Sequence, residues 1–428
     1  MPLHPKRWPL SVRVLVGLLI GIFLGLYGRS EPYLLGMDNA DLGQIGMLII
    51  RLLKALAIPL ILFGILDAFI QTRITTRSGL RLIFICLINV SMAFTIGLAL
   101  MNWVKPGLAW RGHLDRLIAL APSQANPPVL TNVTLDPLHN LGGYIPQSLL
   151  EPILNNNVIS IVLMAILFGA ALGSLKRDPP VHGAVELSPL ENSISAIYHL
   201  LVRVIDWVVK IVPLAVLCLV AQAVGKSGLG IFSDLAGYLG IIALGLCLHG
   251  LIYYPLVAWF AAGVSPRRYL GGGADAVLSG ISTNSSLASV PITLQCLKRI
   301  GVGDNSARLA ACAGTNLNND GVTLYEAMTA LFLAQAIGLD LDAGQQIVIV
   351  LAALMAGVGI AGVPEAGLIV LPLVLGAAGL PESVVAAAIP LIAPVDWILA
   401  RLRSAVNVLS DMLVALLLDA WERRSPTV

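Results

Sequence analysis

The chain consists mostly of apolar segments that are long enough to cross a membrane. A bilayer core requires about 20 predominantly apolar residues in one helix. Six candidate segments lie near residues 11–28, 43–71, 80–103, 145–174, 194–223 and 230–262. We expect each of them to be a conventional transmembrane helix, the first included, because no small-residue cleavage site follows its apolar run.

After Arg268 the apolar pattern is interrupted three times. The interruptions read "GGGADAVLSGISTNSSLASVP", "GTNLNNDG" and "GVGIAGVPEAG". Such clusters at membrane depth would leave backbone groups without partners in lipid, which is costly unless the segment packs in protein or lines a cavity. The functional site is therefore expected in this part of the chain.

Composition agrees with this interpretation. Of the 428 residues, 57% are hydrophobic and 12% are charged, and the mean hydropathy is +0.88. These values exceed those of soluble domains and predict a polytopic membrane protein. A net charge of +2 without a basic patch argues against a nucleic-acid partner. The five cysteines form no CxxC pair and are interpreted as packing residues.

The distribution of lysine and arginine sets the orientation, since cytoplasmic loops carry an excess of both. With the N-terminus inside, the loop 104–144 lies outside and most basic loop residues lie inside. Keeping Lys298 and Arg308 inside as well requires 269–299 to be a re-entrant hairpin, and a second hairpin is then needed near 344–377. The predicted fold is all-α, with eight transmembrane helices, two re-entrant hairpins and both termini in the cytoplasm.

The stretch "DWILARLRSAVNVLSD" (396–411) carries an unusual polar stripe. At about 100° per residue, Asp396, Arg403, Ser404, Asn407 and Asp411 fall within roughly a third of the helix circumference. Charges in a bilayer are costly, so the stripe is expected to face the protein interior. The Arg403 fork suits a carboxylate, and the oxygens of Asn407 and Asp411 suit a small hard cation such as sodium. The alternative is a purely structural ion-pair network.

The stretch "GTNLNNDGVTLYEA" (314–327) predicts a second group of oxygen ligands. A helix break there would free the carbonyls of Gly314 and Asn316 and direct the side chains of Asn318 and Asp320 inward. This is the outline of a cation site. The alternative is a helix kink that asparagine side chains stabilise.

These segments together resemble the sodium:dicarboxylate symporter family, which includes animal excitatory amino acid transporters and archaeal aspartate transporters. The resemblance rests on "NNDGVTLYEA", "GIAGVPEAG", "NSSLASVPIT", "VDWILARLRSAVNVLSD" and "KALAIPLILFGILDAF", and covers residues from about 12 to 420. It implies a homotrimer in the plasma membrane, the inner membrane in a bacterium. It also implies an elevator-type mechanism, in which a scaffold (1–79 and 107–229) holds a moving transport domain (80–106 and 230–428).

The resemblance also implies a set of binding residues. The substrate would contact Ser285, Ser286, Val322, Val363, Gly367, Arg403, Ser404 and Asn407. A first sodium would bind Gly314, Asn318, Asn407 and Asp411, a second the carbonyls of Asn316, Gly357, Val358 and Ile360, and a third Asp320 with Asn89. Asp396 and Arg401 would lie beside the substrate site. Coupling to protons instead of sodium stays open.

One departure from the family pattern bears on the substrate. Members that transport amino acids carry an aspartate at the position of Ala400, where it accepts the substrate ammonium. A buried ammonium without an acceptor is costly. We therefore expect a substrate without an amino group, such as a C4 dicarboxylate, with an acidic amino acid as the alternative. Asn319, Val322, Leu287 and Val90 also depart from the pattern, and the ion count is left open.

Two other functional classes compete with a symporter. A passive anion channel would carry current without stoichiometric cation uptake. An intramembrane enzyme is not expected, because the sequence shows no Ser/His or Cys/His pair and no HExxH motif. The six histidines show no pairing that indicates a metal or a proton relay.

Overall fold

The computed structural model describes residues 10–28, 32, 36–71, 76–111, 145–154, 158–177, 186–360 and 366–424. The first half of the chain forms α1 (Leu10–Gly28), α2 (Asn39–Gln71), α3 (Thr76–Val104), η2 (Pro106–Trp110), α6 (Glu151–Leu154), α7 (Val158–Arg177) and α8 (Ser188–Ser227). The second half forms α9 (Gly230–Cys247), η3 (Leu248–Tyr253), α10 (Tyr254–Ala262), α11 (Pro266–Thr283), α12 (Ser286–Ile300), α13 (Asp304–Arg308), η4 (Leu309–Ala313), η5 (Gly314–Asn316), α14 (Asp320–Ala336), α15 (Ala343–Gly359), α16 (Ala366–Ala377) and α17 (Glu382–Arg424).

The expectation of an all-helical membrane protein is confirmed. Within the described residues, four helices are long and apolar enough to cross a membrane, namely Gly79–Val104, Ser188–Gly225, Leu235–Ala262 and Val395–Arg424. The apolar segments of α1, α2 and α7 are shorter. The count of eight spans stays a prediction.

One predicted boundary is wrong. A span was expected from residue 145, but residues 145–150 are not helical, and the long helix of this region, α7, begins at Val158. Proline in a helix interior removes a backbone hydrogen bond. Pro146 therefore explains why residues 145–150 do not form a helix.

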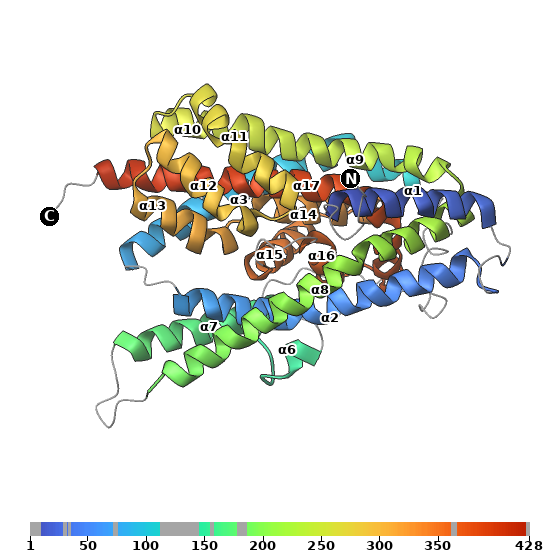
Figure 1. The fold of residues 1–428 in the computed structure, drawn as a ribbon, viewed down its shortest axis with the longest axis horizontal. Coiled ribbons are helices and arrows are strands. Elements are labelled where there is room, and N and C mark those ends of the chain that lie inside the picture. Colours follow the sequence, from blue (N-terminus) through green and yellow to red (C-terminus); the bar gives the residue numbers. More distant parts are fainter. Residues whose placement is uncertain are drawn as a thin grey trace, which may run out of the picture.

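The helices α1, α2, α7 and α8 form one packed group, in which α8 lies along both α1 and α2, and α7 lies along α2. Figure 1 shows α2, α7 and α8 side by side along the molecule. Glycines make the contact between α1 and α8 possible. A Cβ on Gly21 would come within 2.6 Å of the Leu217 carbonyl oxygen, and one on Gly25 within 2.7 Å of the Val224 Cβ. Small residues at this spacing allow close helix packing in membranes.

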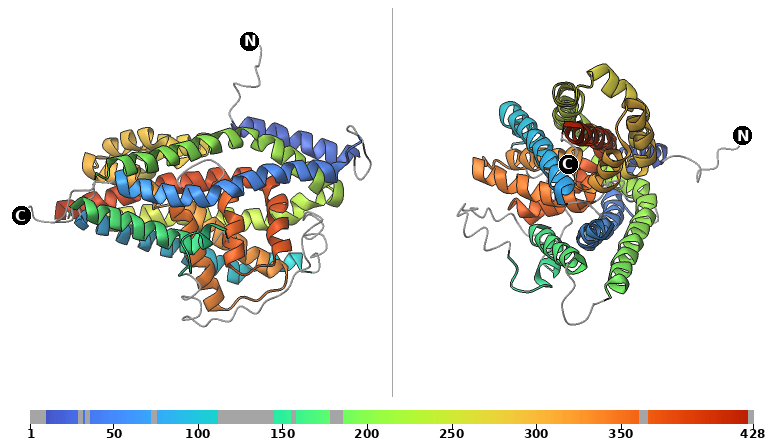
Figure 2. Two further views of the ribbon diagram at one scale, coloured as in Figure 1. Left: turned by 90° about the horizontal axis from the view of Figure 1, so that it is seen from below. Right: turned by 90° about the vertical axis from the view of Figure 1, so that its left-hand side faces the viewer.

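The last helix, α17, is the centre of the other part of the fold. It packs against α11, α12, α14, α16, α9 and α10, and both views of Figure 2 show it enclosed by other helices. In an apolar window of 18 residues within its candidate span, 83% of the residues are buried, against 44% for the corresponding window in α3. A helix so enclosed can carry polar groups that lipid would not tolerate.

The two segments predicted to be hairpins each contain a pair of packed helices, and that these pairs are re-entrant stays a prediction. In the first, α11 and α12 pack along each other and are joined at Asn284, which has a φ of 53°. Asparagine tolerates this left-handed conformation better than most residues. In the second, α15 packs against α16. The tip of the second hairpin, residues 361–365, lies outside the described residues.

Candidate functional site

The polar stripe of α17 faces the protein interior as predicted, and its arginine is held by its aspartate. Nη1 and Nη2 of Arg403 donate to the two carboxylate oxygens of Asp396 at 2.6 and 3.0 Å. Both side chains are at least 97% buried. The guanidinium carbon also lies 3.9 Å from the centre of the Tyr325 ring. Arg403 is therefore fixed on two sides, by a charge pair and by an aromatic face.

The first residues of α16, the returning helix of the second hairpin, lie against this guanidinium. A Cβ added to Gly367 in α16 would lie 2.8 Å from Cζ of Arg403 and 3.0 Å from the Tyr325 ring. Any larger residue there would force the guanidinium or the Tyr325 ring to shift. The structure therefore places Gly367 beside Arg403, as the predicted substrate site requires, whereas Val363 lies outside the described residues.

The tip of the first hairpin contacts the same face of α17. Ser404 donates from its hydroxyl to Oδ1 of Asn284 at 3.2 Å. Ser285 is the N-cap of α12, and its hydroxyl oxygen accepts a hydrogen bond from the backbone N–H of Ala288. The hydroxyl of Ser286 is buried and has no hydrogen-bond partner among the described residues. The N-terminus of α12, which favours negative charge, thus lies near Ser404.

Asn407 connects α17 to the break before α14. Its side-chain oxygen accepts a hydrogen bond from the backbone N–H of Gly321 at 2.8 Å, and its amide donates to Oδ1 of Asn319 at 3.1 Å. A Cβ at Gly321 would lie 2.5 Å from the carbonyl oxygen of Arg403. The start of α14 is therefore pressed against the turn of α17 that carries Arg403. Val322, the next residue of α14, is buried.

Two of the residues expected for the first sodium site, Asn318 and Asp411, lie beside each other. The Thr315 hydroxyl donates to Asp411 at 2.7 Å, and the Asn318 amide lies 3.5 Å from the other carboxylate oxygen. The side-chain oxygen of Asn318 is buried and has no hydrogen-bond partner among the described residues. A buried acceptor without a donor beside a carboxylate is chemically suited to a hard cation. Gly314 lies in η5, just before Thr315.

The carbonyls expected for the second sodium site lie at the end of α15. This helix ends at Gly359, and Ile360 is fully buried while Val358 is half-buried. The Gly357 carbonyl accepts from the Asn319 amide at 2.8 Å, which ties this end of α15 to the break before α14. The last carbonyls of a helix favour a cation. The backbone of Asn316 closes η5.

Two expected site residues have other neighbours. The oxygen of Asn89 in α3 accepts a hydrogen bond from the Tyr253 hydroxyl at 3.1 Å. Arg401 donates to the Trp397 carbonyl of its own helix, and its guanidinium lies over the Trp397 ring at 5.7 Å. Arg401 is therefore directed along the flank of α17, away from the stripe.

Two buried groups, Glu326 and His249, were not predicted from the sequence. Glu326 in α14 is fully buried, and neither carboxylate oxygen has a hydrogen-bond partner among the described residues. The sequence showed no pairing of His249 that indicates a metal or a relay, but its Nε2 lies 3.4 Å from Oδ2 of Asp320, so this histidine does have an acidic neighbour. The sequence did contain a signal for both residues, because an ionisable residue inside an apolar helix by itself indicates function.

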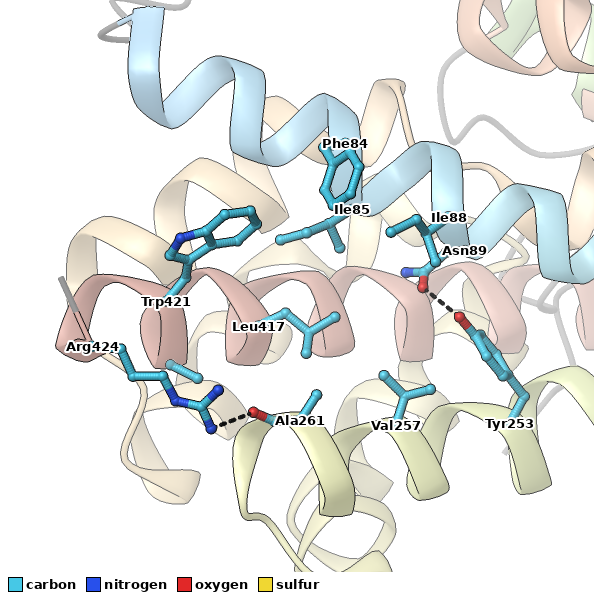
Figure 3. A pocket seen from close by; sticks show the side chains of 11 residues that line it. Phe84, Ile85, Ile88, Asn89, Tyr253, Val257, Ala261, Leu417, Trp421 and Arg424 are labelled. Carbon is cyan, nitrogen blue, oxygen red and sulfur yellow. Dashed lines mark hydrogen bonds between the residues drawn. The ribbon is translucent and has the colours of Figure 1, made fainter.

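A separate cavity of about 480 Å³ lies between α3, α10 and α17 (Figure 3). Its walls are mostly hydrocarbon, with Arg424 at one end and Asn89 at the other. Arg424 follows Arg403 by 21 residues on the same helix, which corresponds to roughly 30 Å along its axis. The cavity is therefore distinct from the polar cluster around Arg403.

The fold and the cluster define a class of protein. Broken helices whose polar ends meet inside a membrane protein are typical of secondary transporters. A comparison with protein families matches residues 10–421 to the sodium:dicarboxylate symporter family. The chain belongs to this family, whose members are transporters and not enzymes.

Individual relatives agree with this assignment. The chain is 28% identical over 427 residues to the proton/sodium-glutamate symport protein of Bacillus subtilis, a match that covers 97% of this chain and 93% of the relative. It is 26% identical over 451 residues to excitatory amino acid transporter 3 of Mus musculus, covering 95% and 84%. It is 35% identical over 270 residues to excitatory amino acid transporter 1 of Mus musculus, covering 62% and 48%.

Proposed function

We propose that this protein is a sodium-coupled symporter that imports a small acid with two carboxylates. The observation that carries the proposal is the convergence of both hairpins and the start of α14 on one stripe of α17. There a buried guanidinium, a helix N-terminus and an oxygen cluster lie within two to three helical turns. Arg403 would bind one carboxylate and the first hairpin, with Ser285 and Ser286, the other.

Shared residues support coupling of the acid to sodium. Asn407 contacts the backbone of Gly321, one residue after Asp320, and lies one turn from both Arg403 and Asp411. A ligand that orders Asn407 from one side therefore prepares it for the ligand on the other side. Such coupling between two sites is reciprocal. A passive anion channel would have no need for this arrangement.

Two substrate classes compete for the site. The relatives named above carry glutamate or excitatory amino acids in their names, which favours an acidic amino acid. Ala400 favours the second candidate, a C4 dicarboxylate without an amino group. It is buried on the stripe one turn before Arg403 and offers no acceptor for an ammonium.

Glu326 supports a role for protons beside sodium. An ionised carboxylate that is fully buried without a partner is costly. Its protonated form would avoid that cost, and opening of the site to water would allow the proton to leave. Glu326 is therefore the candidate proton carrier.

The assembly and location follow the family. We propose a homotrimer in which the group α1, α2, α7 and α8 is the static scaffold and α3 with α9–α17 moves as the transport domain. We also propose that both termini face the cytoplasm and that, in a bacterial host, the membrane is the inner one.

The test is uptake by the purified full chain in proteoliposomes. Radiolabelled aspartate and succinate are offered separately, with sodium and proton gradients imposed one at a time. Concentrative uptake of either acid that requires the inward sodium gradient supports the proposal. Current without sodium-dependent accumulation would favour a channel instead.

A further inference from the structure

Three protein groups converge on one carboxylate oxygen of Asp320, the residue expected to hold a third sodium. The hydroxyls of Tyr254 and Ser410 each donate to Oδ2 at 2.8 Å, and Nε2 of His249 lies 3.4 Å from the same oxygen. All four side chains are at least 99% buried. Hydrogen bonds to a charged group are among the stronger ones, and these use the lone pairs that a cation would need at that oxygen.

The backbone is shaped to present these donors. His249 lies in η3, a π-helical segment between α9 and α10, and Tyr254 follows five residues later. The wider π turn brings the two rings to one side, with centroids 4.5 Å apart. Segments of this kind inside α-helices often mark functional positions. Asp320 thereby connects α14 to the α9–α10 span and, through Ser410, to α17.

The helix that should complete the third site offers little oxygen. The side-chain oxygen of Asn89 is directed at Tyr253 and accepts its hydroxyl (Figure 3). Its buried neighbours on α3, Cys86 and Val90, present a thiol and hydrocarbon. Sodium is a hard cation that prefers oxygen ligands. These residues therefore do not fit the ion.

Asp411 differs from Asp320 in this respect. It receives one short hydrogen bond, from Thr315, and a long one from Asn318. The Asn318 oxygen beside it is buried without a partner among the described residues. A cation would satisfy that oxygen, whereas Oδ2 of Asp320 is already satisfied by protein.

We propose that Asp320 binds no coupling sodium in this protein. It is a positioning residue, held by Tyr254, Ser410 and His249, and the cations that drive transport bind at the Asp411 site and at the end of α15. This inference rests on the proposed symport function and specifies its stoichiometry: two sodium ions for each acid molecule.

The stoichiometry can be measured directly on the wild-type protein in proteoliposomes. The membrane potential is clamped at zero, the pH is equal on both sides, and the acid gradient that stops net flux is determined for a tenfold sodium gradient. Two coupled ions balance about a hundredfold acid gradient and three balance about a thousandfold, because each ion contributes equally. A thousandfold balance overturns the inference. Complete absence of sodium-dependent accumulation overturns the proposed function itself.

Variants separate a structural role from ion binding. Asp320→Asn is expected to lower the amount of folded protein or its uptake rate, while the balance stays near a hundredfold. Asp411→Asn is expected to lower that balance. If Asp320→Asn does not fold, Ser410→Ala removes a single donor and is measured in its place. A reduced sodium stoichiometry in Asp320→Asn or Ser410→Ala contradicts the inference.

Discussion

Arg403 donates to both carboxylate oxygens of Asp396, seven residues earlier on the same buried helix. Two turns of α17 thus hold both members of a buried ion pair, and the Tyr325 ring of α14 lies against its guanidinium. Of the five N–H donors of the guanidinium, Asp396 uses two, and the orientation of the whole fork is set by this contact. The carboxylate of a substrate would meet an arginine that is already positioned.

This pair predicts the effect of removing its acid. Asp396→Asn keeps the shape but removes the charge, so the apparent KM for the acid should rise at least about tenfold, which corresponds to about 1.4 kcal/mol. Uptake kinetics at saturating sodium measure the change. Asp275→Asn, which breaks the exposed pair with Arg299, is the matched control and should change KM little. An unchanged KM in Asp396→Asn would show that the pair does not position Arg403.

The contact between Gly367 and Arg403 predicts a second result. Gly367→Ala would place a methyl group 2.8 Å from the guanidinium carbon, and overpacking of this kind costs about 1–3 kcal/mol. Uptake should fall at least about tenfold while the protein remains folded in detergent. Gly376→Ala on the same helix, where a Cβ meets open space, should have wild-type uptake. Equal uptake by both variants would show that Gly367 is not part of the substrate site.

Position 400 predicts a change in selectivity. Ala400→Asp would add an acceptor on the polar stripe beside Arg403, which favours a substrate ammonium. The ratio of aspartate to succinate affinity should rise at least about tenfold, since hydrogen bonds to charged groups contribute about 1.5–3 kcal/mol. Competition between the two labelled acids measures the ratio. A constant ratio would remove the argument from Ala400 for a substrate without an amino group.

Glu326 predicts a separable response to pH. Glu326→Gln keeps the size of the side chain and cannot release a proton. An imposed proton gradient should therefore no longer stimulate uptake, while the sodium requirement remains. Glu382→Gln, at the exposed start of α17, is the control and should respond to pH as wild type does. Continued stimulation of the Glu326→Gln variant by protons would assign that role to another group.

Much of the site could be predicted from sequence because helical periodicity alone places Asp396, Arg403, Asn407 and Asp411 on one face. The polar interruptions at the hairpin tips could be recognised for another reason, namely that lipid does not tolerate such clusters at membrane depth. The start of the 145–174 segment was mistaken because hydropathy does not register the effect of proline on a helix.

Pairings between distant segments could not be predicted in the same way. His249 and Asp320 are 71 residues apart, and the π turn that directs the histidine inward has no sequence signal. The hydrogen bond between Tyr253 and Asn89 also depends on this π-helical segment, because Tyr253 belongs to it. Glu326 was overlooked because it follows the recognisable "NNDG" segment and has no other ionisable residue near it on its own helix face.

The most direct test of the account is sodium-driven uptake with and without Arg403. Wild-type protein in proteoliposomes should accumulate aspartate or succinate above the external concentration only when sodium is higher outside. Arg403→Gln should abolish accumulation of both acids while the protein remains folded. Accumulation that needs no sodium gradient, or that is unchanged in Arg403→Gln, would contradict the claim that this buried guanidinium and its neighbouring oxygens bind an acid together with its ion.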